Sequence, residues 1–156
     1  MERYRQTELV AAGIHEHFVQ SNMSRSRKDI LRGIHYQAAP LGQGKLVQVP
    51  VGAIFDVAVD VDPQSPHFGE WVGVELSAEN GDLLYVPGQY GHAFCTLSED
   101  AIVLYDVTNE YVEDLERGVL WNDPTIGIQW PVSSPSTSQK DTRWPTLESL
   151  RVAAGR

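Results

Sequence analysis

The sequence predicts a mainly β protein, built as a β-sandwich or a barrel. Short runs rich in Val, Ile, Phe and Tyr recur between residues 18 and 107, and several of them alternate apolar with polar residues. Turn signals such as Asn80-Gly81 and Pro87-Gly88 separate these runs. Closely spaced short strands favour a sandwich or barrel over βαβ units. The strands expected from the pattern are 18–20, 45–51, 53–61, 71–76, 82–86, 93–97 and 101–107.

Two further segments flank these strands. Residues 3–13 predict a short N-terminal helix, because helix-forming residues dominate there and Gly13 can end it. Residues 130–145 contain three prolines and little apolar periodicity, which is typical of an extended strap, and residues 146–156 predict a weak terminal helix. The chain length favours one domain over residues 1–156, with its core at about 18–131 and a C-terminal strap at 132–156.

Composition argues against several classes of function. The 12 Lys and Arg residues against 21 Asp and Glu residues give a net charge of −9, which disfavours nucleic acid and anionic membrane surfaces as partners. No run approaches the ~18 apolar residues of a membrane-spanning helix, and the charged N-terminus lacks the apolar segment of a secretory signal. We therefore expect a cytoplasmic protein. The single cysteine, Cys95, lies in an apolar run and is expected to be a buried structural thiol.

A basic segment at residues 25–37 is the first candidate for chemistry. It ends in Arg32-Gly33-Ile34-His35, which places a guanidinium and an imidazole three residues apart around a glycine. In a regular strand these two side chains point to opposite faces, unless Gly33 makes a bulge or bend. From the residues alone, a solvated basic loop followed by a core histidine is the simpler interpretation.

A second candidate lies between Gly81 and His92. Gly81, five residues, Pro87, four residues and His92 have the spacing of the second conserved motif of the cupins. The first cupin motif supplies an H-x-H pair and a glutamate as metal ligands, whereas this chain has Gln37 in place of the second histidine. His15-Glu16-His17 is an H-x-H elsewhere, interpreted as a surface coincidence. The sequence therefore predicts a cupin without a metal.

Longer strings carry a closer resemblance. The chain resembles the dTDP-4-dehydrorhamnose 3,5-epimerase family nearly continuously from about residue 18 to residue 131, and recoverably to Asp141. The matching strings are F-V-Q-S-N (18–22), L-R-G-I-H-Y-Q (31–37), Q-G-K-L-V (43–47), F-D-V-A-V-D (55–60), S-P-H-F-G-E-W-V-G-V-E-L-S-A-E-N (65–80) and W-N-D-P-x-I-G-I-x-W-P (121–131).

The resemblance implies a fold and a reaction. The fold is a cupin-type double-stranded β-helix, or jelly roll, in a homodimer that needs no cofactor. The substrate is dTDP-4-dehydro-6-deoxy-D-glucose, whose C3 and C5 are inverted on the way to dTDP-L-rhamnose. Because both carbons flank the C4 ketone, enolate formation acidifies their protons. Inversion then requires a base on one face, an acid on the other and a group that stabilises the oxyanion.

The resemblance also assigns roles to residues. It implies that His35 is the base, that Asp141 pairs with this histidine, that Tyr105 reprotonates the opposite face and that Lys45 stabilises the enolate. Imidazole suits proton transfer because its pKa lies near working pH. The substrate-binding residues implied are Glu2, Gln20, Asn22, Arg32, His92, Glu116 and Lys140.

Two departures from the family pattern concern the nucleotide. The family's N-terminal D-x-R-G-x-F-x-E motif is represented only by its last residue, at Glu2, which predicts weaker nucleotide binding or a sequence that starts late. Glu110 stands where the family commonly has an aromatic residue, so part of the base-stacking platform is expected to be lost.

Two other functions stay open. One is a single-centre 3- or 5-epimerase of a related dTDP-deoxysugar pathway, and the other is a non-catalytic cupin that binds a sugar nucleotide or a partner. The proton-transfer residues His35, Tyr105 and Lys45 favour an active enzyme, whereas the missing N-terminal motif favours a binding protein.

Overall fold

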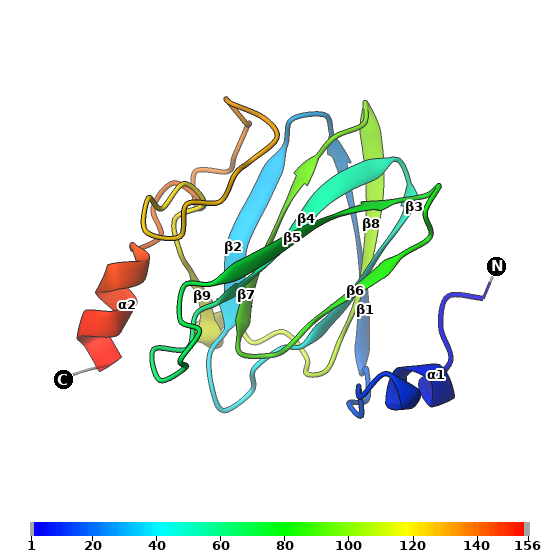
Figure 1. The fold of residues 1–156 in the computed structure, drawn as a ribbon, viewed down its shortest axis with the longest axis horizontal. Helices are drawn as coiled ribbons and strands as arrows, with labels where there is room; N and C mark the ends of the chain where they lie inside the picture. The colour runs from blue at the N-terminus through cyan, green and yellow to red at the C-terminus, as the bar shows by residue number, and fades with distance from the viewer. Residues whose placement is uncertain (1, 155–156) are drawn as a thin grey trace.

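The computed structural model describes residues 2–154. Its helical segments are α1 (Gln6–Ala11), the 3-10 turn η1 (Glu113–Leu115) and α2 (Leu147–Ala154). Its strands are β1 (Gln20–Arg27), β2 (Leu31–Gln37), β3 (Lys45–Val51), β4 (Ala53–Asp60), β5 (Trp71–Ser77), β6 (Leu83–Val86), β7 (Tyr90–Thr96), β8 (Asp100–Val107) and β9 (Glu116–Gly118). Helices α1 and α2 lie at opposite ends of the long axis (Figure 1).

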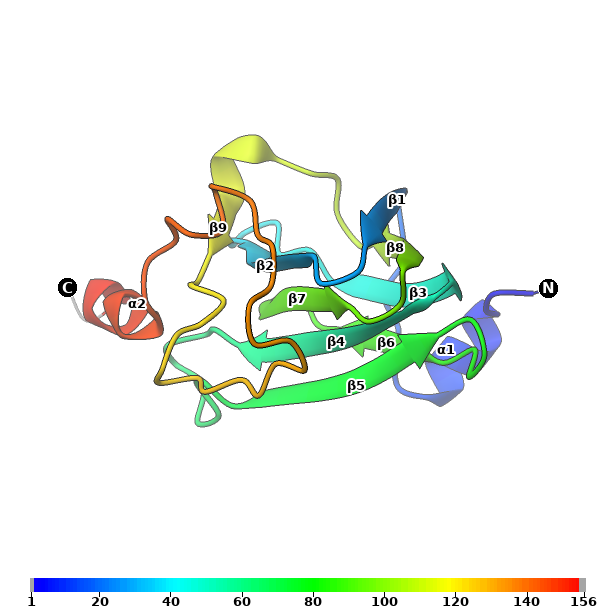
Figure 2. The same cartoon turned by 90° about the horizontal axis from the view of Figure 1, so that it is seen from above.

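The strands form two antiparallel sheets that face each other (Figures 1 and 2). One has the order β1-β8-β3-β6 and the other has the order β5-β4-β7-β2-β9. Val47 and Val103 of the four-stranded sheet pack against Ile54, Ala58 and Phe94 of the five-stranded sheet. This sandwich confirms the mainly β prediction, and the predicted strands from residue 45 onward overlap β3 to β8.

The five-stranded sheet is covered on its outer face as well. Val57 and Val59 of β4 point away from the other sheet and pack with Ile126 and Leu147, which follow β9 in the chain. Strand β4 therefore has two buried faces, although its sequence alternates in part between apolar and polar residues. Its even-numbered residues, including Asp56, face the space between the sheets.

The first helix is shorter than the predicted 3–13, and its end has a clear cause. Gly13 has a φ of 86°, and its N–H donates to the Val10 carbonyl at 3.0 Å. The N–H of Ile14 donates to the Leu9 carbonyl at 2.8 Å. These two bonds form a Schellman motif, so Gly13 ends α1 as the sequence predicts.

Strand β1 corrects two expectations. Only Gln20 of the predicted strand 18–20 lies in a strand, and β1 runs from there to Arg27. The basic segment that starts at residue 25 belongs to the β1–β2 hairpin and is not a free loop. Strand β1 pairs with β8 along its length, from Gln20 opposite Val107 to Arg27 opposite Asp100. The strand escaped prediction because its residues are polar, and its pairing supplies the stability that propensity does not.

The C-terminal strap packs beside β2, as Figure 2 shows. The N–H of Leu31 donates to the Ser136 carbonyl at 2.9 Å, and the N–H of Ser136 donates to the Asp29 carbonyl at 2.8 Å. The predicted terminal helix is observed as α2, and residues 155–156 of that prediction lie outside the described residues. Within residues 2–154, no helix is long and apolar enough to cross a membrane.

Candidate active site

A bulge in β2 decides where Arg32 and His35 point. Arg32 is paired with Phe94 and His35 with His92, so β2 has one residue more than β7 between these two pairs. Gly33 makes this possible, because its φ is 125° and a Cβ there would lie 2.4 Å from the Ala93 Cβ. The bulge puts the side chains of Arg32 and His35 on one face of the sheet. It is the bulge at Gly33 that the sequence allows as the exception to a regular strand.

These side chains line a cavity of about 520 Å³ between the sheets. The five-stranded sheet contributes His35 and His92, the four-stranded sheet contributes Tyr105 and Lys45, and the strap closes a third side with Asp141. The residues proposed as base and acid therefore approach the cavity from opposite sheets. Ser24, Arg32, Phe94 and Lys140 also line it.

His35 and Asp141 form a close pair. His35 Nε2 lies 2.5 Å from Asp141 Oδ1, and 34% of the histidine side chain is exposed against 3% of the aspartate side chain. Ser138 holds Asp141 by accepting its backbone N–H at the carbonyl and at Oγ. Burial acts to raise the pKa of Asp141, but the contacts with His35, Ser138 and Trp144 outweigh burial and keep that pKa below its usual range. The imidazole thus faces a carboxylate.

His92 lines the same cavity and belongs to a second histidine–carboxylate pair, whose carboxylate lies behind it in the core. His92 Nε2 is 2.7 Å from Asp56 Oδ1, and Asp56 is fully buried. The second oxygen of Asp56 has no hydrogen-bond partner among the residues that the structure describes. Asp56 was not predicted as a site residue, because a polar residue in a partly alternating strand is ordinarily expected to face solvent. A lone carboxylate between Ile54 and Val57 was the available signal, since buried aspartates are nearly always paired.

Lys45 lies on the facing sheet and is 7% exposed. Its Nζ donates to the Gln43 carbonyl at 3.2 Å. Burial lowers the pKa of Lys45 to about 8, and the nearby charge of Asp56 partly opposes that change. Lys45 can therefore supply either a cation or a proton close to neutral pH.

Tyr105 lies on β8, directly opposite Asn22 of β1. Burial raises the pKa of Tyr105, and the positive charge of Arg32 opposes that rise in part. A raised pKa keeps the phenol protonated, which is the state that a proton donor requires. Arg32 itself is held by Ser26, whose Oγ accepts from its Nε at 3.0 Å.

The remaining predicted binding residues form one network at the edge of the cavity. Gln20 donates to Asn22 at 2.8 Å and accepts the backbone N–H of Tyr111 at 3.1 Å. The Tyr111 hydroxyl donates to Glu116 at 2.8 Å, and Lys140 forms an ion pair with the same carboxylate. Burial acts to raise the pKa of Glu116, but these two donors outweigh it and lower that pKa.

Known proteins match this chain over most of its length. The profile of dTDP-4-dehydrorhamnose 3,5-epimerase matches residues 1–149. A dTDP-4-dehydrorhamnose 3,5-epimerase of Shigella flexneri is 52% identical over 131 residues, covering 84% of this chain and 72% of that relative. The chain belongs to the dTDP-4-dehydrorhamnose 3,5-epimerase family.

Solved structures agree with this assignment. A dTDP-4-dehydrorhamnose 3,5-epimerase from Bacillus anthracis, with TDP and PPi bound, has a TM-score of 0.90 and 45% identity, covering 93% of this chain and 83% of that chain. A 3′-monoepimerase from Streptomyces bikiniensis, in complex with dTDP-quinovose, has a TM-score of 0.91 and 35% identity, covering 98% and 78%. These findings confirm the predicted family, the cupin-like fold and the class of enzyme.

Among the described residues of this epimerase, Glu2 is the only predicted site residue that lies away from the cavity and its edge. It pairs with Arg5 at 2.8 Å. The neighbouring Arg3 binds Asp106 and Gln48. Asp106 follows Tyr105 on β8 and points to the opposite face of the sheet, so this N-terminal segment lies on the outer face of the four-stranded sheet.

Gln37, which stands in place of the second histidine of the cupin motif, has a structural role. The Gln37 amide donates to the carbonyls of Leu41 and Glu110, and its oxygen accepts the N–H of Val112 at 2.8 Å. Gln37 therefore joins β2 to the chain after β8. In the described residues of this epimerase, no group of three or more His, Cys, Asp or Glu side chains could hold a metal ion.

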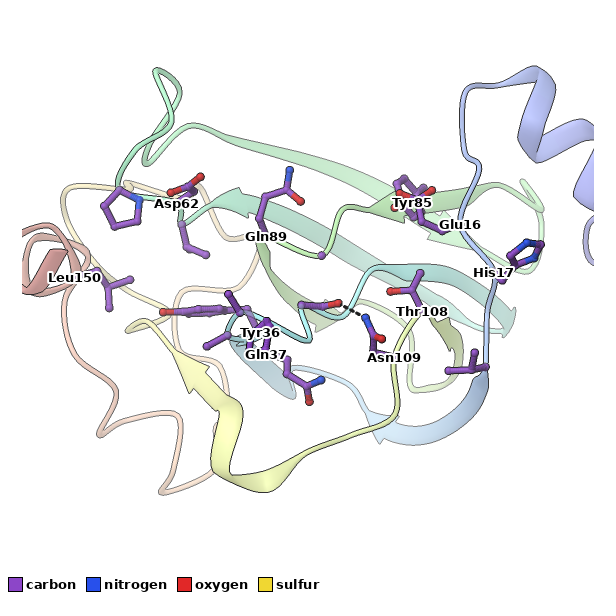
Figure 3. A pocket seen from close by; sticks show the side chains of 18 of the residues that line it. Glu16, His17, Tyr36, Gln37, Asp62, Tyr85, Gln89, Thr108, Asn109 and Leu150 are labelled. Carbon is purple, nitrogen blue, oxygen red and sulfur yellow. Dashed lines mark hydrogen bonds between the residues drawn. The ribbon is translucent and has the colours of Figure 1, made fainter.

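A larger hollow of about 1020 Å³ lies elsewhere on this epimerase, between α2 and the segment that precedes β1 (Figure 3). Tyr36, Tyr85 and Leu150 line it, together with Glu16 and His17 of the predicted surface H-x-H. The predicted catalytic and substrate-binding residues do not line it. We therefore place the chemistry in the smaller cavity, where the histidine–carboxylate pairs gather.

Proposed function

We propose that this chain converts dTDP-4-dehydro-6-deoxy-D-glucose into dTDP-4-dehydro-L-rhamnose by inverting C3 and C5. The observation that carries the proposal is the pairing of His35 with Asp141 on one side of the cavity and the buried phenol of Tyr105 on the facing sheet. A hexose between the two sheets would have a base on one face and a proton donor on the other. Inversion at a carbon requires that arrangement.

The residues can be given successive roles. His35 removes a proton from the carbon next to the C4 ketone, and the electron pair moves to the ketone oxygen as an enolate. Asp141 stabilises the imidazolium that forms. The Lys45 ammonium stabilises the enolate oxygen. Tyr105 then donates its proton to the same carbon from the opposite face, and the phenolate and imidazolium return to their starting states by proton exchange with solvent.

Nucleotide binding is proposed for the residues around the cavity. Arg32 would bind the diphosphate, because its guanidinium is held by Ser26 and carries several donors. Gln20 and Asn22 lie next to Tyr111. Tyr111 is about half exposed, so its ring is available to stack on the nucleobase of the substrate. We also propose that two copies assemble as a homodimer, as the family resemblance implies, which sedimentation of the purified chain would test.

Solvent exchange tests the proposal. The chain is incubated with dTDP-4-dehydro-6-deoxy-D-glucose in D₂O, and the sugar is followed by mass and proton spectra. Deuterium at both C3 and C5, absent with His35→Asn, is the expected result. His67→Asn is a matched control, because His67 pairs with Glu70 on the surface, away from the cavity. Absence of exchange at either carbon in the unmodified chain would contradict the proposal.

A single-centre epimerase is the second candidate, and the likeness to the Streptomyces bikiniensis 3′-monoepimerase favours it. The same experiment separates the two, because deuterium at one carbon alone would identify a single-centre enzyme. Tyr105→Phe separates deprotonation from reprotonation in either kind of enzyme. This variant should lose inverted product while it retains some exchange, because deprotonation and return of a proton to the same face need no phenol.

A further inference from the structure

Trp144, in the C-terminal strap, lies beside the proposed base. Across the five-stranded sheet, His35 of β2 is paired with His92 on one side and with Gly118 of β9 on the other. Gly118 has no side chain, and a Cβ built there would lie 2.5 Å from the Trp144 indole. The indole thus occupies the place where a cross-strand neighbour of His35 would stand.

The Trp144 indole lies close to both His35 and Asp141. Its ring lies edge-on to the His35 imidazole, with centroids 6.1 Å apart and planes at 67°. Lys140 lies 5.5 Å from the same ring centroid, in a cation–π contact. The indole N–H is buried, and no residue between 2 and 154 accepts a hydrogen bond from it. It is close enough to Asp141 to help lower the pKa of that carboxylate.

We propose that Trp144 is a positioning residue for the base, which fixes the orientation of the His35 ring and draws part of the Asp141 charge away from it. The inference rests on the proposed function, in which His35 removes a proton. A buried N–H without a full partner is costly, so its placement beside a carboxylate is the arrangement that reduces this cost. The indole N–H and His35 then share the negative charge of the same carboxylate.

A change in the pH dependence can be assigned to Trp144 only if the other charged groups around His35 are unchanged. The titratable and charged groups that face His35 are Arg32 on β2, Lys45 on β3, His92 on β7, Tyr105 on β8, Glu116 on β9, and Lys140 and Asp141 on the strap. Trp144→Phe leaves all of them unchanged and keeps an aromatic ring above Gly118. It removes the N–H, and with it the proposed effect on Asp141.

The experiment compares the pH dependence of kcat/KM for the unmodified chain and Trp144→Phe. The acid limb should move to higher pH by about half a unit, because the full Asp141 charge then favours the imidazolium. Below the acid limb, the rate of deuterium exchange should fall about threefold, which is the change that half a unit in pKa produces. Trp130→Phe is the matched control, since its indole donates to the Trp121 carbonyl at 2.8 Å and packs on Phe55. Its acid limb should coincide with that of the unmodified chain.

A readout without turnover separates this inference from the proposed function. The titration midpoint of the His35 ring protons is measured by NMR, with His35→Asn used to assign the signal. A higher midpoint in Trp144→Phe supports the positioning role even when the chain shows no exchange. An unchanged midpoint and acid limb would overturn it, and so would a loss of rate that is equal at every pH and accompanied by a lower Tm.

Discussion

Two histidines line the cavity, and each is paired with a carboxylate in a different way. Asp56 and His92 lie on the adjacent strands β4 and β7, and both are buried. Asp141 reaches His35 from the strap, and about a third of the His35 side chain stays exposed. The first pair is fixed by the sheet itself, whereas the second depends on how the strap packs. A base must reach the substrate and exchange protons with solvent, so accessibility separates the proposed base from the deeper pair.

The largest effect is expected when each histidine is removed in turn. His35→Asn should lower deuterium exchange at C3 and C5 by on the order of 10³-fold, because the proposed mechanism contains no second base. His92→Asn should keep a readily measurable rate, because His92 would only contact the sugar. Exchange rates in D₂O provide the measurement. If His92→Asn lost exchange as completely as His35→Asn, the assignment of the base to the accessible pair would be wrong.

Replacing the two aspartates should separate activity from stability. Asp141→Asn should lower kcat on the order of 10²-fold, because the imidazolium loses its carboxylate, while the protein stays folded. Asp56→Asn should lower kcat less, yet reduce the free energy of unfolding by about 1–3 kcal/mol, because Asp56 is fully buried. Steady-state kinetics and urea unfolding check both. Equal losses of activity and stability in the two variants would remove the distinction between the pairs.

The sequence predicted the accessible pair better than the buried one, for physical reasons. His35 and Asp141 were found through family strings, whereas Asp56 was hidden because alternation does not tell which face of a doubly covered strand points inward. The polar strand β1 and the three-residue β9 were missed because their partners, and not their own residues, define them. The contact of Trp144 with Gly118 joins segments that no local pattern connects.

The bulge that aligns the two pairs can be broken at Gly33. Gly33→Ala should reduce the free energy of unfolding by about 2–3 kcal/mol and displace His35 from its place opposite His92, since a Cβ would meet Ala93. Gly81→Ala is the control, because Gly81 also has a positive φ, of 65°, but has open space around it. It should lose about 1 kcal/mol and retain activity. Similar losses in both variants would show that backbone strain alone, and not crowding beside the bulge, limits this position.

The smallest effect concerns the pH dependence of stability. The folded-state pKa of Asp141 lies below its usual range, because contacts led by the His35 hydrogen bond outweigh burial. Its contribution to the free energy of unfolding is therefore fully present above the unfolded pKa of about 3.9. That contribution disappears as the pH falls through the lower folded value. Urea unfolding of the unmodified chain and Asp141→Asn between pH 2 and 7 should diverge by up to about 1 kcal/mol above pH 5 and converge at the acid end.

Asp100 gives that measurement a matched surface reference. Its pKa is also lowered, chiefly by the hydrogen bond from Arg25, but this pair is exposed to solvent. Added salt should therefore abolish the pH dependence contributed by Asp100 and leave most of that contributed by Asp141, whose side chain is buried where the strap packs against the sheet. If salt removed both contributions equally, the strap would not shield the His35–Asp141 pair from water. The His35–Asp141 pair would then differ from the buried His92–Asp56 pair only in the exposure of His35.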